Sequence, residues 1–291
     1  MNRKAVLYAL ASAALFGAST PAAKLLVGSV QPAILAGLLY CGAGIGVAIL
    51  RRLLPSTASV PSEAPLSRRD LPWLAGAIAA GGVLGPLLLM IGLARTDAAT
   101  ASLLLTLEGA ATALVAWSLF HENFDRRIVL GMMSLVAGAA VLSWTGVPTV
   151  DAALGPLAIV AACMAWAVDN NLTRKVSLAD PLQIVLLKGL VAGPFNIGLG
   201  LWIGAAIPGL PTAVIAGIIG FFGYGLSLAL FVAALRHLGA ARTAAYFSIA
   251  PFLGSMAAVA VLGEPVTPQL GNRRCLDGGW CRTASDGTAR T

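Results

Sequence analysis

The sequence predicts an all-α membrane protein that crosses the bilayer about nine times, and three observations support this prediction. The chain of 291 residues is 58% hydrophobic but only 11% charged, whereas soluble domains carry roughly 25% charged residues. Its mean hydropathy is +0.87. Its apolar stretches are about 20 residues long, the length that an α-helix needs to span a bilayer. Because backbone groups in lipid must be paired within the segment, we expect these stretches to be helices.

Turn residues and charges separate the expected helices. The longest polar stretch, residues 55–70, is rich in proline and serine and is typical of a flexible linker. The first apolar stretch also fits a secretory signal peptide, but further apolar stretches follow it directly, so we interpret it as a retained helix. The nine expected spans are residues 5–27, 31–50, 71–94, 97–119, 128–146, 152–173, 181–204, 212–235 and 239–262.

The basic residues between these spans alternate from one side to the other. If the N-terminus is cytoplasmic, the outer loops before the C-terminal tail hold only Lys24 and Arg95. The positive-inside rule therefore predicts a multi-pass protein of the cell membrane with a cytoplasmic N-terminus. The net charge of +7 forms no continuous basic face, which excludes nucleic acid as a partner. The expected inner segments hold Arg3, Lys4, Arg51, Arg52, Arg68, Arg69, Arg126, Arg127, Arg174, Lys175, Arg236 and Arg242.

Cysteine and histidine residues form neither a disulfide framework nor a metal site in the sequence. Two of the four cysteines, Cys41 and Cys163, lie in apolar stretches, and the other two lie in the polar tail without metal-ligand spacing. His121 and Glu122 resemble the start of a zinc-protease motif, but no second histidine follows one turn later. The sequence also contains no phosphate-binding loop. We therefore expect no cofactor, no metal ion and no enzymatic activity.

The second half of the sequence is similar to the first. Residues 14–24 align without gaps with 164–174, and residues 97–122 align with 239–264. A repeat of about 145 residues would hold five helices, and an odd number forces the second copy to cross the membrane in the opposite direction. Secondary transporters use such inverted repeats, with the substrate site between them near the midplane. The predicted domains are a first repeat at 1–147, a second at 148–270 and a polar tail at 271–291.

These recurring motifs resemble the EamA-type transporters of the drug/metabolite transporter superfamily, over nearly all of residues 5–270. The resemblance implies ten helices in two inverted five-helix repeats, and transport of small metabolites, often export. We therefore expect a secondary active transporter that works by alternating access, with proton coupling as one option. The motifs are Leu15-Phe16-Gly17 with Lys24, Ala98-Ala99, Leu107-Glu108 and Glu122 in the first half, and Trp166 to Arg174, Pro251 and Gly263-Glu264-Pro265 in the second.

The chain departs from the family pattern at three places. Gly109 stands where the family often has proline, and His121 replaces the usual glycine before Glu122. The tenth helix should begin just after Gln269, yet residues 271–291 are polar and cannot span a membrane. The alternative function is therefore that of an inactive or non-transporting membrane protein from a truncated or frameshifted transporter gene.

Glu108 is the strongest candidate for a site residue. It falls midway along the fourth expected helix, where a carboxylate costs roughly 2.5–3.5 kcal/mol. We expect it to bind a proton or a substrate amine in a central cavity, or else to be a neutral group that joins two helices. Asp169, Asn170 and Trp166 lie near the inner end of the sixth helix. They are expected to form either a wall of that cavity or an interfacial cap.

Lys188 lies a third of the way into the seventh expected helix. Its long side chain is expected to extend to the cytoplasmic interface or to bind substrate. If it turns inward, it should pair with Glu108 or Asp169. Asn196 and Tyr246 complete the candidates, as polar groups that more often join helices than bind ligands. The expected partners are a small-molecule substrate and membrane lipid, and a homodimer is left open.

Overall fold

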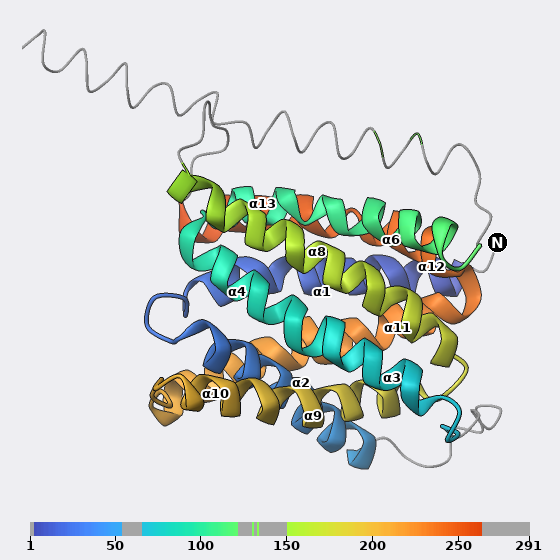
Figure 1. Ribbon diagram of the computed structural model, residues 1–291, viewed down its shortest axis with the longest axis horizontal. Coiled ribbons are helices and arrows are strands. Elements are labelled where there is room, and N and C mark those ends of the chain that lie inside the picture. The colour runs from blue at the N-terminus through green and yellow to red at the C-terminus, as the bar shows by residue number, and fades with distance from the viewer. Residues whose placement is uncertain (1–2, 54–65, 122–129, 131–132, 134–149, 264–291) are drawn as a thin grey trace, which may run out of the picture.

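The computed structural model describes residues 3–53, 66–121, 130, 133 and 150–263, and its helices run roughly along one common direction (Figure 1). Within these residues eight helical spans are long and apolar enough to cross a membrane, and the only β-type pairing is an isolated bridge between Val27 and Val30. The spans are α1 (Arg3–Lys24), α2 (Pro32–Leu53), α3–η1–α4 (Leu71–Ala77, Ile78–Leu84, Gly85–Arg95), α5–α6 (Ala98–Leu104, Thr106–Ser118), α8 (Val150–Val176), α9 (Pro181–Trp202), α10–η2–α11 (Leu210–Gly220, Phe221–Leu226, Ser227–Leu238) and α12–α13 (Ala240–Phe247, Ala250–Leu262).

These spans agree with eight of the nine expected from the sequence, to within a few residues at their ends. The remaining expected span, 128–146, and the tail, 271–291, lie outside the described residues. The same holds for most of the linker expected at 55–70.

One end of the bundle, here called the arginine-rich end, joins three helix termini. Arg51 at the end of α2 forms an ion pair with Asp180 before α9, with an N···O distance of 2.9 Å. Arg236 near the end of α11 donates to the carbonyl oxygens of Ser177 and Ala179, at 2.8 and 2.7 Å. The end of α2, the α8–α9 connection and the end of α11 therefore lie on the same side.

The opposite end, here called the Lys24 end, is closed in a similar way. Lys24 at the end of α1 donates to the carbonyl oxygens of Leu93 and Thr96, at 2.5 and 2.7 Å. Gly155 near the start of α8 packs directly against Arg95 and Thr96. Thus α1 runs toward the Lys24 end while α8 runs away from it, as Figure 1 also shows. The predicted inverted arrangement of the two halves is confirmed.

Both halves contain a π-helical stretch in the middle of their third span. These stretches are η1, Ile78–Leu84, and η2, Phe221–Leu226. The alignment that places residue 97 on residue 239 places residue 79 on residue 221, so the two stretches occupy equivalent positions. π-Helical turns are rare and frequently occur at functional sites. Neither stretch was expected from the sequence.

The next span of each half is broken at equivalent positions. The break between α12 and α13 comes just before Pro251, which lies at the start of α13 and has no backbone N–H for a helical hydrogen bond. Pro251, which the sequence places in the middle of the span expected at 239–262, thus accounts for this break. The span expected over 97–119 is present but has a similar interruption, because α5 ends at Leu104 and α6 starts at Thr106. There the N–H of Glu108 donates to Leu105 O at 3.1 Å, a tighter turn than in an α-helix.

The ends of the fourth spans explain one departure from the family pattern. Gly263 follows α13 with a φ of +64°, and His121, at the equivalent position after α6, has a φ of +50°. Positive φ favours glycine, because a side chain with a Cβ is strained there. His121 thus keeps the backbone geometry of a glycine position.

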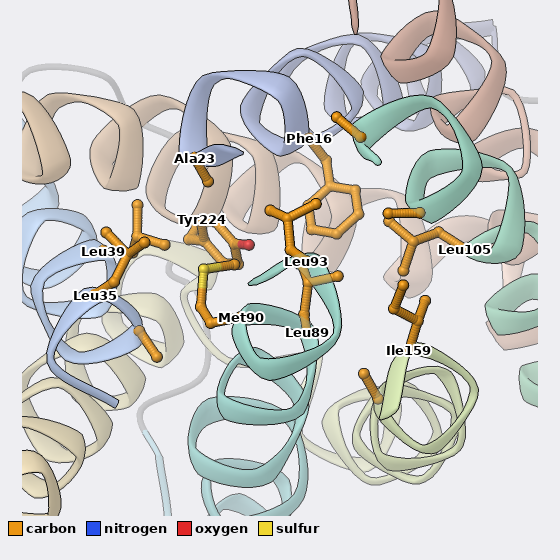
Figure 2. Close-up of a cluster of buried hydrophobic side chains, with 14 of the residues drawn as sticks. Phe16, Ala23, Leu35, Leu39, Leu89, Met90, Leu93, Leu105, Ile159 and Tyr224 are labelled. Carbon is orange, nitrogen blue, oxygen red and sulfur yellow. The ribbon is translucent and has the colours of Figure 1, made fainter. Parts of the chain in front are cut away.

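The core lies where the two halves meet (Figure 2). Phe16 of α1 and Tyr224 of η2 contact edge-on, with ring centroids 5.7 Å apart. Leucines from α2 and α4 surround them in one buried cluster with Ile159 of α8. Elsewhere α2 and α9 are in close contact at glycine residues. A Cβ placed on Gly189 of α9 would lie 2.5 Å from the Cα of Gly44 of α2. Small residues permit such close helix contact in membranes.

Candidate functional site

Glu108 is positioned by the break in the fourth span. It lies in the first turn of α6 and is 7% exposed. The unpaired N–H groups and the dipole at a helix N-terminus favour a negative charge there. Its Oε1 accepts a hydrogen bond from Asn170 Nδ2 of α8 at 3.0 Å. The break therefore gives a buried carboxyl group local support that an uninterrupted helix would not provide.

Asp169 and Lys188 form a buried ion pair between α8 and α9. Lys188 Nζ lies 2.5 Å from Asp169 Oδ1, and the two side chains are 1% and 5% exposed. Thr173, one turn after Asp169, donates to the same Oδ1 at 2.8 Å and accepts from Lys188 Nζ at 2.9 Å. The expected extension of Lys188 to the interface was wrong, because the aspartate and the threonine satisfy its charge inside the bundle. Of the two expected inward pairings, the one with Asp169 is present.

The amides next to Asp169 join α8 to α6. Asn170 Nδ2 also donates to Thr112 Oγ1 at 3.1 Å, in addition to Glu108. Asn171 Nδ2 donates to the carbonyl oxygens of Thr112 and Ala167, at 3.0 and 2.9 Å. These bonds fix the carboxyl of Glu108 relative to α8, and none of the donors carries a charge.

The π-helical stretch η1 supplies carbonyl groups to this network. Gly81 O accepts from Tyr40 Oη at 2.6 Å and from Trp166 Nε1 at 3.0 Å. Gly82 O accepts from Asn196 Nδ2 at 3.1 Å. A Cβ on Gly81 would collide with the carboxylate of Asp169. Glycine in η1 therefore lets α8 approach closely enough to place its tryptophan and its aspartate.

The two buried tyrosines of this region are predicted to respond differently to loss of their hydroxyl groups. Tyr40→Phe should destabilise the protein by about 0.5–1.5 kcal/mol, because it removes the hydrogen bond to Gly81 O. Tyr224→Phe should have a smaller effect or none, since the Tyr224 hydroxyl makes no hydrogen bond of good geometry among the described residues and has only Ser19 near it. Thermal unfolding of both variants in the same detergent measures the difference. Equal loss of stability in the two would contradict this account of the network.

A cavity of about 40 Å³ lies where these groups meet. Its walls come from both halves of the sequence: α1, α2 and α6 on one side, and α8, η2, α11 and α12 on the other. Two of its wall residues, Ser12 and Ser227, donate to each other's carbonyl oxygens at 2.8 and 2.9 Å and so tie α1 to α11. The lining residues are Ser12, Phe16, Tyr40, Glu108, Trp166, Asp169, Asn170, Gly223, Tyr224, Ser227, Leu228, Phe231 and Phe247.

The cavity brings together four of the seven residues proposed from the sequence: Glu108, Asp169, Asn170 and Trp166. Lys188 does not line the cavity, but it forms an ion pair with Asp169, which does. Asn196 binds the carbonyl of Gly82 and is not among the lining residues.

Tyr246 lies elsewhere. It packs against Ala5, Ala9, Ala234 and Leu238, in a cluster formed by α1 and α11. It is therefore not brought to the cavity, and its inclusion among the site candidates has no support from this placement.

Most of the apolar residues that line the cavity could not be predicted from the sequence. Phe231 and Phe247 are ordinary residues in hydrophobic helices, and nothing in the sequence distinguishes them from lipid-facing phenylalanines. Phe16 was noted only as part of a motif. Its equivalent in the second half is Trp166, and the two rings contact edge-on at 5.6 Å. That correspondence within the repeat is the signal that could have identified Phe16 as a cavity residue.

Comparisons with known proteins agree with this architecture. A model of the EamA-like transporter family matches residues 3–144 and 153–270. An uncharacterized transporter of Methanothermobacter thermautotrophicus is 28% identical over 264 residues, which cover 86% of this chain and 77% of that protein. One solved crystal structure shares the fold with a TM-score of 0.69 at 19% identity, over 88% of this chain and 89% of that chain.

The fold and these relatives define a multi-pass membrane transporter. The family match covers most of the chain and includes both halves. The protein belongs to the EamA-like transporter family, and the resemblance found in its sequence motifs is confirmed.

Proposed function

We propose that this protein is a secondary active transporter that exports small metabolites across the cytoplasmic membrane by alternating access. One observation carries the proposal: the cavity between the two halves contains the buried carboxyl group of Glu108. Ionisable groups within membrane spans are costly and usually mark substrate, ion or proton pathways. A cavity closed by both halves is also where inverted-repeat transporters bind their substrates.

Glu108 is proposed to couple transport to protons. A single carboxyl group can hold either a proton or a cationic group of the substrate, but not both. Binding of the substrate would therefore release the proton, and binding of a proton would release the substrate. Its hydrogen-bond donor Asn170 is neutral and therefore does not fix the charge state of the acid. Asp169, by contrast, is neutralised by Lys188. We assign this ion pair to holding α8 against α9 and not to carrying protons.

The breaks and π-helical stretches supply places where the helices can bend. Among the described residues, each half has one π-helical stretch and one span interrupted between two α-helices, at equivalent positions. Alternating access requires two arrangements of similar energy, which two similar units in opposite orientation can provide. We propose repeats at 1–147 and 148–270 as these units, with the arginine-rich end and the N-terminus on the cytoplasmic side, in accordance with the positive-inside rule.

The proposal predicts proton movement driven by substrate. The full-length chain would be reconstituted into vesicles that contain a trapped pH-sensitive dye, and amino acids and amines would be added one at a time. For at least one compound, the wild type should change the internal pH. Glu108→Gln, which keeps the side-chain shape but cannot ionise, should reduce that rate at least tenfold.

Asp70→Asn is the matched control, because it removes an acid at the surface of the arginine-rich end and should leave the rate unchanged. Labelling of Ser67→Cys, in a chain whose natural cysteines are replaced by serine, reports the orientation in the vesicles. A folded wild-type protein that moves neither protons nor any compound of the panel would contradict transport. That result would favour the alternative of a non-transporting membrane protein.

A further inference from the structure

The cavity walls are dominated by aromatic rings. Phe16 lies at the centre of the group, with centroid distances of 5.6 Å to Trp166, 5.7 Å to Tyr224 and 5.3 Å to Phe247. Tyr40 and Tyr224 are 5.5 Å apart. Aromatic ring faces attract cations, most strongly where water is excluded. The walls are therefore suited to a ligand that combines a positive charge with an apolar body.

The charges at the cavity point to the same kind of ligand. Two acids line it, Glu108 and Asp169, and no lysine or arginine of the described residues does. The charge of Asp169 is balanced by Lys188 at 2.5 Å. The hydrogen bond to Glu108 Oε1 comes from an uncharged amide. When Glu108 is ionised, the cavity has one negative charge without a cationic partner, and a ligand with one positive charge would balance it.

A third observation concerns Tyr224, which lines the cavity and is 4% exposed. Its hydroxyl group is buried and makes no hydrogen bond of good geometry within the described part of the chain. The Ser19 hydroxyl lies near it, but this group donates to Phe16 O at 2.6 Å. Buried polar groups are normally well paired, so this hydroxyl at the cavity wall can take a ligand atom as an additional partner. The oxygen of this hydroxyl can accept a hydrogen bond from an ammonium N–H.

We propose that this cavity binds primary amines with an apolar or aromatic body, and that it discriminates against amino acids and carboxylates. The ammonium group would contact Glu108, the rings of Phe16 and Trp166, and the hydroxyl oxygen of Tyr224. A ligand carboxylate would find no cation, because Lys188 is already bound to Asp169 and Thr173. This inference deepens the proposed function, since it concerns the same cavity.

The size of the cavity sets a condition on binding. About 40 Å³ is more than one water molecule needs, and an ammonium head group is of similar size to water. The body of the amine requires the walls to separate. Binding is therefore coupled to movement of the two halves, and a ligand with a bulkier apolar body should hold them further apart.

Four compounds with a common phenyl group test the proposal: phenethylamine, 2-phenylethanol, 3-phenylpropanoate and phenylalanine, which are a cation, a neutral molecule, an anion and a zwitterion. Their binding to the purified full-length chain in detergent would be measured by titration calorimetry. We expect phenethylamine to bind at least tenfold more tightly than each of the others. Glu108→Gln should weaken phenethylamine at least tenfold, and Tyr224→Phe should weaken it severalfold. Asp70→Asn should have no effect.

Equal affinity for phenethylamine and phenylalanine, no binding of any of the four, or unchanged binding to a folded Glu108→Gln variant would each overturn the inference. Tyr224→Phe keeps the test valid if Glu108→Gln does not fold. The calorimetry is independent of flux. Amine binding without transport in vesicles would refute the proposed function alone, whereas transport of a compound other than an amine, without amine binding, would refute only the inference about the substrate class.

Discussion

Replacement of Lys188 by methionine is expected to destabilise the protein by about 3–5 kcal/mol, the largest effect of any single charge removal in the described structure. The substitution leaves the volume of the side chain nearly unchanged but removes the cation that lies 2.5 Å from Asp169. Asp169 would then be a buried carboxylate without a counter-charge, and breaking a buried pair from one side is costly in this range. The change in stability is measured by thermal unfolding in detergent, in which the remaining fraction of monodisperse protein is recorded at each temperature.

The double variant Lys188→Met with Asp169→Asn is the informative comparison. It removes both charges, so most of the lost stability should return, although Thr173 loses a charged partner. Lys4→Met, at an exposed position in the first turn of α1, controls for loss of a lysine as such. If the Lys188 single variant is as stable as the wild type, or if the double variant is less stable than the single variant, the ion pair does not have the structural role assigned to it.

Replacement of Gly189 by leucine is expected to prevent correct packing of α9 against α2. Already the Cβ would lie 2.5 Å from the Cα of Gly44 and 2.7 Å from the carbonyl oxygen of Tyr40. These neighbours are backbone atoms, which cannot rotate away as a side chain can. Overpacking usually costs 1–3 kcal/mol, and about 3 kcal/mol or more is expected here because two helices must separate. The yield of monodisperse protein and its unfolding temperature should both fall.

The same helix contains a matched control. A Cβ on Gly198 meets no atom within 4 Å, and this position is exposed on the outer surface of the bundle. Gly198→Leu therefore makes an identical chemical change in α9 without a steric conflict and should leave stability nearly unchanged. Comparable losses for Gly189→Leu and Gly198→Leu would mean that helix propensity, and not contact with α2, determines the effect.

The positions of the helices could be predicted from the sequence because the bilayer restricts the possible structures so strongly. A stretch of about 20 apolar residues has essentially one solution in lipid, and the charges at the helix ends indicated which way each helix runs. The break at Pro251 was predictable for a local reason, since proline removes a hydrogen bond. The equivalent break at Leu105 has no such residue, so only the repeat itself could have revealed it.

The candidate site was predictable where it is polar and not where it is apolar. Glu108, Asp169 and Lys188 stood out because charges within spans are costly, and this argument does not depend on knowing the contacts. Which acid pairs with Lys188 depends on the rotation of α8 and α9 about their axes, which a sequence with such weak polar patterning does not determine. The role of Gly81 and Gly82 depends on the π-helical geometry of η1, which has no recognised signature in the sequence.

The equivalent positions of the two π-helical stretches also bear on how the gene was duplicated. A π-helical turn contains more residues than an α-helical turn, so we infer that each stretch arose from an insertion in an ancestral helix. Independent insertions at equivalent places in both halves would be a coincidence, whereas a single insertion before the duplication accounts for both. The ancestor is thus inferred to have been a shorter protein that already contained this irregularity and that assembled in pairs of opposite orientation. After the fusion the two copies diverged. The first copy acquired Glu108, where the second has Ala250, and the second copy acquired Asp169 and Lys188, where the first has Ser19 and a leucine.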